Sequence, residues 1–245
     1  MQPVQKVSII IPCYNEELTI CEILTRVNQV MIDGVFFEIL VVDDGSQDAS
    51  ADIIKKHPEL YSKFIQLPTN QGKGAAVKAA LKEATGDFIL FQDADLEYDP
   101  QNYHKLLMPI LKHGAEIVIG SRLIAPQFTR VCYFWNRVGN KAITLLFNVM
   151  NNLTFSDIYS CYLVYKRTLL NPDDLRTLGW QQHAEIIAKI VKKTNIIYEV
   201  PIDYFGRSFE EGKKIRWYHV FSVFLTIIKY KFTKESNIQP EVSCD

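Results

Sequence analysis

The stretch DFILFQDADLE, residues 87–97, decides the fold of this chain. Its first half is a short apolar run, which is typical of a strand buried inside a sheet. Asp93 and Asp95 follow at a spacing that puts both carboxylates on one face of an extended chain. At the carboxyl end of a strand in an open α/β sheet, such residues look into the crevice where ligands bind. A solvated turn fits this stretch equally well, so the rest of the chain has to decide.

Strand and helix patterns alternate regularly on both sides of this stretch. Regular alternation implies parallel strands joined by right-handed crossovers, and therefore an α/β fold with a mostly parallel sheet flanked by helices. Short apolar runs predict strands at residues 6–11, 36–42, 64–67, 87–92 and 115–120. Periodic apolar spacing predicts helices at residues 16–30, 50–57, 73–85 and 102–113.

Composition excludes several classes of protein. The chain has 245 residues with 48% hydrophobic content, enough for one well-packed domain. A formal net charge of −1 argues against a general nucleic-acid binder. The five cysteines form no C-x-x-C pair, so we expect free thiols in a reducing compartment. We expect neither a signal peptide nor a membrane-spanning helix, which would need about 20 apolar residues.

The second half of the chain is basic and aromatic. Residues 122–156 contain no Asp or Glu but several basic and aromatic residues, and residues 207–234 form a second basic, aromatic region. Basic amphipathic helices of this kind lie on anionic membrane surfaces. The alternative is a helix packed on the sheet with a solvated basic rim. The sequence therefore predicts a domain at residues 1–205, a basic membrane-interface or closing segment at 206–234, and a disordered tail at 235–245.

Polar clusters follow four of the predicted strands. Asn15 follows the first, Asp43 and Asp44 the second, and Ser121 and Arg122 the last. Each cluster alone also fits a turn, a helix cap or a surface ion pair. Because the carboxyl ends of parallel strands share one edge, we expect these clusters and Asp93 and Asp95 to meet there.

Residues 70–74, NQGKG, predict an anion site at the start of a helix, with Lys73 as its cation. The segment is not a P-loop, because the G-x-x-x-x-G-K-[ST] spacing is absent. The dinucleotide-binding fingerprint G-x-G-x-x-G is also missing after the first strand.

Taken in order, the motifs PCYNE, VVDDGSQD, NQGKG, DADLEYDP and GSR resemble those of family 2 inverting glycosyltransferases. Within that family the chain looks most like dolichyl-phosphate mannose synthases and bacterial polyprenyl-phosphate glycosyltransferases, over about residues 6–232. The resemblance implies a GT-A fold, a nucleotide-sugar donor such as GDP-mannose or UDP-glucose, Mg²⁺ or Mn²⁺, and a polyprenyl phosphate acceptor. It also implies a cytoplasmic protein held peripherally on the cytoplasmic face of a membrane.

The resemblance also assigns roles to residues, each by its position in the matching motif. Asp95, Arg122 and Asp157 are the implied catalytic residues, with Asp157 either a base or a group that orients the acceptor. Arg122 and Arg130 are implied to bind the acceptor phosphate. The implied metal ligands are Asp93, Asp95 and Glu97, the last standing where many relatives have Gln. The implied nucleotide-sugar site comprises Pro12, Tyr14, Glu16, Asp43, Asp44, Lys73, Asp93, Asp95, Arg207 and Lys213.

Two segments depart from the family pattern. Residues 180–185, WQQHAE, replace a more usual Gly-Phe-Asp that precedes the glutamate, and residues 162–165, YLVY, lack the usual Lys or Arg. Both leave the identity of the sugar and of the acceptor open. The resulting hypothesis is metal-dependent, inverting transfer of mannose or glucose to a polyprenyl phosphate. The alternatives are transfer to a saccharide hydroxyl, a non-catalytic nucleotide-sugar-binding scaffold, and a nucleotidyltransferase.

Overall fold

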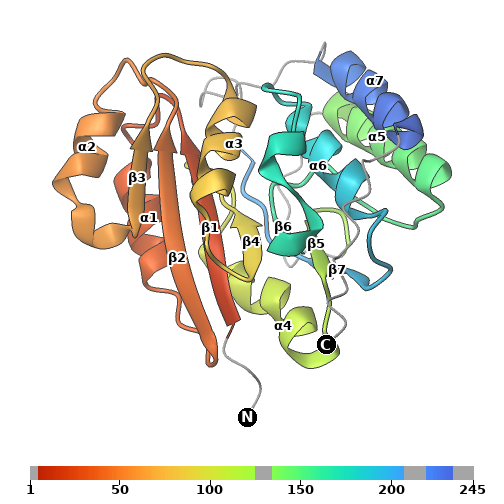
Figure 1. The fold of residues 1–245 in the computed structure, drawn as a ribbon, viewed down its shortest axis with the longest axis horizontal. Coiled ribbons are helices and arrows are strands. Elements are labelled where there is room, and N and C mark those ends of the chain that lie inside the picture. Colours follow the sequence, from red (N-terminus) through yellow and green to blue (C-terminus); the bar gives the residue numbers. More distant parts are fainter. Residues whose placement is uncertain (1–4, 125–133, 207–218, 234–245) are drawn as a thin grey trace, which may run out of the picture.

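One seven-stranded sheet runs through the centre of the molecule, in the order β3-β2-β1-β4-β6-β5-β7 (Figure 1). The structure is a computed structural model and describes residues 5–124, 134–206 and 219–233. The strands are β1 (Gln5–Cys13), β2 (Val35–Asp43), β3 (Lys63–Gln66), β4 (Phe88–Phe91), β5 (Ile117–Ser121), β6 (Leu163–Lys166) and β7 (Ile197–Pro201).

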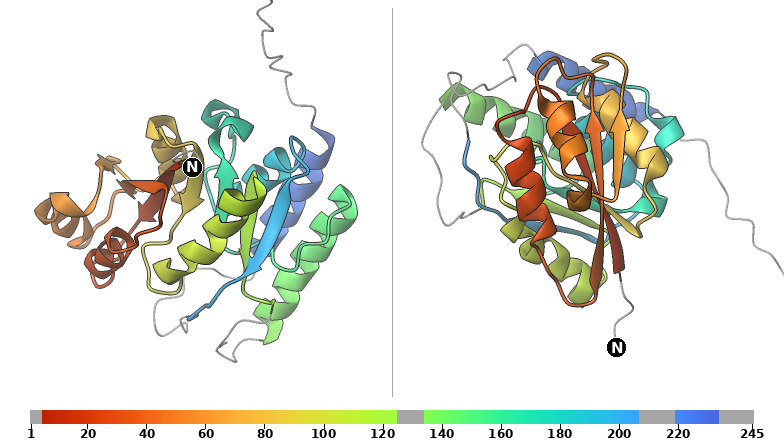
Figure 2. Two further views of the ribbon diagram at one scale, coloured as in Figure 1. Left: turned by 90° about the horizontal axis from the view of Figure 1, so that it is seen from below. Right: turned by 90° about the vertical axis from the view of Figure 1, so that its left-hand side faces the viewer.

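Helices cover both faces of the sheet, which is why the central strands are apolar throughout. Ile9, Ile10 and Ile11 of β1 are fully buried, as are all four residues of β4. Figure 2 shows the sheet nearly edge-on, with α1 and α4 on one side and α3 on the other. The helices are α1 (Ile20–Asn28), α2 (Ser50–Lys56), α3 (Lys73–Glu83), α4 (Tyr103–His113), α5 (Phe134–Asn151), α6 (Gln182–Ile190) and α7 (His219–Phe232).

The parallel arrangement expected from the sequence is confirmed for every described strand except β6. This strand lies between β4 and β5 and is antiparallel to both, with Val164 opposite Leu90 on one side and Val118 on the other. Because β6 runs in the opposite direction, it begins at the edge of the sheet where the parallel strands end. The residues just before β6 therefore lie beside the polar strand ends.

The first helix begins later than its apolar spacing predicts, at Ile20 instead of residue 16. The preceding backbone N–H groups bond to the loop after β2, since Asn15 N–H donates to Ser46 Oγ and Glu16 N–H donates to Ser50 Oγ. Asn15 also has a positive φ of 51°, which a helix does not allow. These contacts tie the loop after β1 to the loop after β2.

Helices α5, α6 and α7 pack together beside the β5–β7 end of the sheet (Figure 1). Lys192, just beyond α6, donates to the carbonyls of Tyr230 and Thr233 at the end of α7, where carbonyl groups lack helical partners. No helix in the described part of the chain is long and apolar enough to cross a membrane.

A buried ion pair on α6 fixes the loop that precedes it. The Glu185 carboxylate accepts hydrogen bonds from the N–H groups of Arg176 and Thr177 and from Lys189 Nζ at 2.7 Å. Glu185 is fully buried and the Lys189 side chain is 8% exposed. Breaking a pair of this kind leaves an uncompensated charge in the protein interior.

We expect Glu185→Ala to lower the free energy of unfolding by about 3–5 kcal/mol, because it leaves the Lys189 ammonium buried without its carboxylate. Urea denaturation followed by circular dichroism measures this change. Glu22→Ala is the matched control, since Glu22 and Arg26 form an exposed pair at the same i,i+4 spacing. The control should cost less than about 0.5 kcal/mol. Equal losses in the two variants would contradict the buried role of Glu185.

Candidate active site

The four polar strand ends meet at one cavity of about 590 Å³ over the carboxyl edge of the sheet. Loops after β1, β2, β4 and β5 contribute to its wall, and so do α3, α5 and α6. The expected site residues that line the cavity are Pro12, Tyr14, Glu16, Asp44, Lys73, Asp93, Asp95, Glu97 and Arg122. Two others, Asp43 and Asp157, are fully buried just outside it. Arg130, Arg207 and Lys213 lie outside the described residues.

Asp43 and Asp44 both hold loop backbone in place. Asp44 accepts hydrogen bonds from the N–H groups of Gln71 and Gly72 at 2.9 and 2.8 Å. Asp43 accepts one from the N–H of Ser46 at 3.2 Å. The pair therefore joins the loop after β2 to the start of α3. Contact of either carboxylate with a nucleoside stays a prediction.

The start of α3 lies against the loop that carries Trp180. Gly74 N–H donates to the Leu178 carbonyl at 2.8 Å, and a Cβ atom at Gly74 would lie 2.5 Å from the Leu178 carbonyl carbon. Gly72 has a φ of +97°, a conformation that favours glycine. These two glycines allow the close approach that brings Trp180 beside Lys73.

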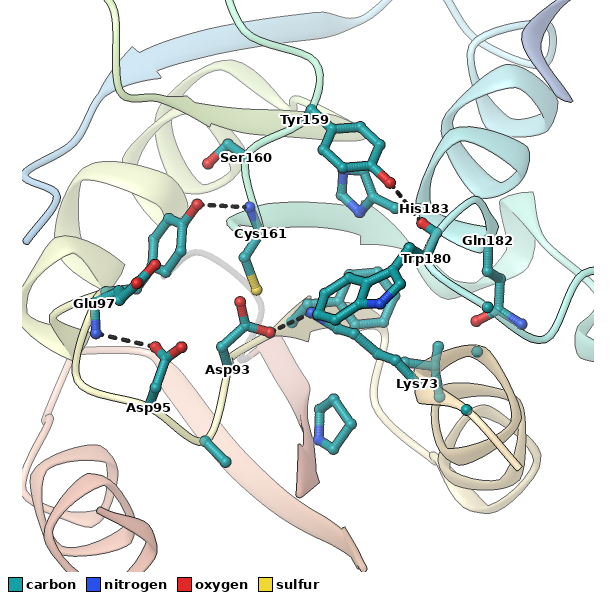
Figure 3. Close-up of a pocket in the computed structure, with 18 of the residues that line it drawn as sticks. Lys73, Asp93, Asp95, Glu97, Tyr159, Ser160, Cys161, Trp180, Gln182 and His183 are labelled. Carbon is teal, nitrogen blue, oxygen red and sulfur yellow. Dashed lines mark hydrogen bonds and ion pairs between the residues drawn. The ribbon is translucent and has the colours of Figure 1, made fainter. Parts of the chain in front are cut away.

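Lys73 and Asp93 form an ion pair inside the cavity (Figure 3). Burial alone would raise the pKa of Asp93, but the charge and hydrogen bond of Lys73, assisted by the Cys161 thiol, hold this pKa below its usual value. The Lys73 ammonium also lies 5.3 Å from the centroid of the Trp180 ring, a cation–π contact. Asp93 is therefore ionised at neutral pH and shares the cavity with a fixed cation.

Asp95 and Glu97 lie on the turn after Asp93. Asp95 Oδ1 accepts a hydrogen bond from Glu97 N–H at 3.0 Å, and Glu97 Oε2 accepts one from Tyr204 Oη–H at 2.6 Å. Within the described ranges, no three His, Cys, Asp or Glu side chains form a cluster arranged to hold a metal ion.

The carboxylates of Asp93 and Asp95 nevertheless fit a magnesium or manganese site of the kind completed by a substrate. Mg²⁺ prefers hard oxygen ligands and is usually held by one or two carboxylates together with phosphate oxygens and water. Both carboxylates lie on the cavity wall. Glu97 as a third ligand stays a prediction.

Across the cavity, Arg122 is held by Asp157 in a bidentate pair. Nε donates to Asp157 Oδ2 at 2.7 Å and Nη2 donates to Oδ1 at 2.9 Å. The arginine side chain is 15% exposed and the aspartate is fully buried. Among the described residues, Nη1 of Arg122 has no hydrogen-bond partner, so one edge of the guanidinium is available to a ligand.

Asp157 is itself positioned by a second acidic residue, Glu199. The Glu199 carboxylate on β7 accepts hydrogen bonds from the N–H groups of Ser156 and Asp157 at 3.0 and 3.1 Å. Burial would raise the pKa of Asp157, but the adjacent Arg122 charge holds it below its usual value. Since both its oxygens already bond to Arg122, Asp157 is well suited to orient that guanidinium and poorly suited to accept a proton.

Several cavity residues were not singled out as site residues from the sequence. They come from the segment before β6 and from the start of α6. Residues 180–185 depart from the family pattern, which was the available signal for the second group, but a departure gives no position in space. These residues are Tyr159, Ser160, Cys161, Trp180, Gln182 and His183, with Tyr98 and Tyr204 completing this side of the cavity.

Comparison with known proteins identifies the family. The Glycosyl transferase family 2 model matches residues 8–171. A dolichol-phosphate mannosyltransferase of Pyrococcus furiosus is 30% identical over 85% of this chain and 59% of its own length. An undecaprenyl-phosphate 4-deoxy-4-formamido-L-arabinose transferase of Salmonella paratyphi B is also 30% identical, over 86% of this chain and 63% of its own length. The chain thus spans less than two thirds of either relative.

Solved structures confirm the expected GT-A architecture. Glucosyl-3-phosphoglycerate synthase from Mycobacterium tuberculosis, crystallised with Mn²⁺, uridine diphosphate and glucosyl-3-phosphoglycerate, superposes with a TM-score of 0.70. The match covers 95% of this chain and 82% of that one at 20% sequence identity, which shows a shared fold. From the family match, the two curated relatives and this fold, we conclude that the chain belongs to glycosyl transferase family 2.

Proposed function

We propose that this protein transfers a hexose from a nucleotide sugar to a polyprenyl phosphate, with inversion at the anomeric carbon. The observation that carries the proposal is the arrangement of charges in one cavity. Lys73, Asp93 and Asp95 line it together with Arg122, and each cation has its own carboxylate partner. Such a cavity can bind one phosphate group on each side of a sugar. The names of the two curated relatives, which act on dolichol phosphate and undecaprenyl phosphate, agree with it.

The donor would lie over β1, β2 and the start of α3. Pro12, Tyr14 and Asp44 line the cavity there and would contact the nucleoside. Lys73, at the first turn of α3, would face the diphosphate, because a helix N-terminus and an ammonium group both favour negative charge. GDP-mannose and UDP-glucose are the donors to test first, with mannose favoured by the resemblance.

A divalent ion held by Asp93 and Asp95 would supply Lewis-acid stabilisation of the negative charge on the departing nucleoside diphosphate. The chain's own contribution there is Lys73, which adds a second positive charge beside Asp93. Arg207 and Lys213 stay candidates for the same task.

The acceptor phosphate would bind at Arg122. A phosphate monoester has a second pKa of about 6 and is largely dianionic at neutral pH, so its oxygen attacks without a strong general base. Asp157 and Glu199 hold the guanidinium in one orientation, and fixed orientation of the attacking group supplies much of the rate. Arg130 stays a candidate second contact.

Transfer to a saccharide hydroxyl is the main alternative, and it needs a general base beside the acceptor. Asp157 is the carboxylate nearest that role, yet both its oxygens bond to Arg122 and its pKa is lowered. This arrangement favours an acceptor that is already ionised.

The outer face of helix α5 favours contact with a membrane surface beside the cavity. Ile143 and Phe147 pack inward, while Trp135, Leu145 and Val149 are 78%, 65% and 74% exposed at helical spacing on the outer face. Apolar exposure of this extent on one helix face is typical of an interfacial helix. We therefore propose peripheral association with the cytoplasmic face of a membrane.

The first prediction from this function concerns turnover. Purified protein with Mn²⁺ or Mg²⁺, a short-chain polyprenyl phosphate in detergent, and GDP- and UDP-sugars should yield a glycosyl phospholipid detectable by mass spectrometry. Asp95→Asn should lower kcat by about 100-fold or more, because a neutral amide is a much weaker ligand for a hard cation. The exposed Asp173→Asn is the control and should keep wild-type activity. Full activity in Asp95→Asn would overturn the metal assignment.

A second prediction separates the acceptor side from the donor side. Arg122→Lys should reduce kcat/KM for polyprenyl phosphate by about 10- to 100-fold, because lysine cannot keep the bidentate contact with Asp157 while facing a phosphate. Donor affinity, measured by calorimetry with the nucleoside diphosphate, should stay unchanged.

Asp157→Asn should reproduce the acceptor defect of Arg122→Lys without shifting the pH dependence of kcat. Arg26→Lys, an exposed arginine on α1, is the control. A donor-binding defect without an acceptor defect would mean that the two sides of the cavity are reversed. Loss of a titrating group from the pH profile of Asp157→Asn would identify this residue as a base.

A third prediction concerns the membrane. Leu145→Asp with Val149→Asp should reduce flotation with vesicles containing anionic lipid by about ten-fold, because two charges would enter the apolar interface. Met31→Asp is the control, since Met31 is 86% exposed but lies outside α5. Equal flotation of all three proteins would exclude α5 as a membrane contact.

A further inference from the structure

His183 and Tyr159 line one wall of the cavity. Their rings are 5.7 Å apart in an edge-to-face arrangement, and Figure 3 shows both across the cavity from Asp93. The charges of Lys73 and Arg122 act on both rings, and Arg122 Nη2 donates to the Tyr159 carbonyl at 3.2 Å, so the pair lies near the proposed donor cation and the proposed acceptor cation. If the donor diphosphate and the acceptor phosphate bind as proposed, the transferred sugar has to lie against this wall.

The protonation of His183 is fixed by its surroundings. Its Nε2 lies 3.1 Å from the carbonyl oxygen of Ile158, and because a carbonyl only accepts, Nε2 carries the hydrogen. Burial, together with the positive charge of Lys73, lowers the pKa of His183 to about 4. The imidazole is therefore neutral at physiological pH, and its Nδ1 is a hydrogen-bond acceptor.

Within the described residues, nothing donates to this Nδ1. The same wall holds a second polar group without a partner, since Ser160 is fully buried and its Oγ has no hydrogen-bond partner among the described residues. Both residues line the cavity. Buried polar groups are normally paired, so the buried Ser160 hydroxyl indicates that a ligand completes this wall. His183 is part-buried and lines the same cavity, so its Nδ1 is open to that ligand.

We infer that His183 is a specificity-determining residue whose Nδ1 accepts a hydrogen bond from a hydroxyl group of the transferred sugar. The inference rests on the proposed function, because it takes the ligand in this part of the cavity to be the hexose. It assigns His183 a role in sugar recognition that is distinct from metal, diphosphate or acceptor binding. A sugar lacking that hydroxyl, or carrying only an acceptor there, would leave the Nδ1 unpaired and would bind more weakly.

Two substitutions separate this role from a structural one, because each keeps a different half of the imidazole. The side chain of His183→Asn places an oxygen acceptor near the position of Nδ1 and loses the contact with Ile158. The side chain of His183→Gln places an amide donor near the position of Nε2, keeping the contact with Ile158, and loses the acceptor. His113→Asn and His113→Gln are controls, since His113 stacks on Tyr198 at the end of α4.

The experiment is calorimetric titration of each variant, with Mn²⁺ present, using UDP and UDP-glucose and then GDP and GDP-mannose. For the pair that binds the wild type, we expect His183→Gln to weaken the nucleotide sugar by about ten-fold and to leave the nucleoside diphosphate unchanged, as loss of one hydrogen bond predicts. His183→Asn should retain most of the affinity for both ligands. The controls should match the wild type.

Donor analogues provide a second readout that does not depend on how well a variant folds. In the wild type, one of the four analogues deoxygenated at C2, C3, C4 or C6 should bind about ten-fold more weakly than the parent donor. That analogue should lose nothing further in His183→Gln, because the variant already lacks the acceptor.

Three results would overturn the inference. Equal weakening of the nucleoside diphosphate and the nucleotide sugar would assign His183 to diphosphate binding or to folding. Normal binding in His183→Gln with a defect in His183→Asn would mean that the contact with Ile158 is what matters. If the wild type binds the nucleoside diphosphates but discriminates against none of the deoxy analogues, the sugar does not lie on this wall. Failure of the wild type to bind any nucleotide or nucleotide sugar would overturn the proposed function as well.

Discussion

The direction of β6 determines how the cavity is built. A strand that runs antiparallel between two parallel neighbours starts at the edge where those neighbours end, so residues 156–162 lie over the carboxyl edge of the sheet. This places Asp157 beside Arg122 and Cys161 beside Asp93. In a sheet made only of parallel strands, the segment before this strand would lie at the opposite edge. The proposed acceptor side of the cavity therefore depends on one reversed strand.

Most of the sheet could be predicted from the sequence, because local apolar runs and helical spacing specify those elements. The polar residues after β1, β2, β4 and β5 could be placed together for the same reason, since topology alone brings parallel strand ends to one edge. The start of α1 was misplaced because Asn15 and Glu16 donate to side chains 31 and 34 residues away, which local spacing does not report. Strand β6 was missed because its apolar run of three residues is too short to distinguish a strand by itself, and its direction depends on the path of the whole intervening chain.

The wall formed by Tyr159 and His183 could not be predicted for a related reason. These residues belong to segments 24 positions apart in the sequence, and each lies 60 or more positions beyond Asp93. The segments meet because His183 bonds to the Ile158 carbonyl and Tyr159 Oη–H donates to the Trp180 carbonyl at 2.7 Å. Resemblance to a family drew attention to residues 180–185 as a departure, but the contacts that join them to Tyr159 exist only in the folded chain.

The two cations of the cavity differ in how readily a phosphate can reach them. Asp157, the partner of Arg122, is fully buried and lies outside the cavity, so it can remain bonded while Nη1 faces a ligand. Asp93, the partner of Lys73, lines the same cavity as Lys73 itself, so an incoming diphosphate meets a neutralised pair. A dianion gains little electrostatic binding energy at such a pair unless another cation neutralises Asp93 and leaves Lys73 free. If the donor diphosphate binds beside Lys73 and the acceptor phosphate at Arg122, as proposed, the donor needs a further cation to neutralise Asp93, whereas Arg122 is already in place for the acceptor.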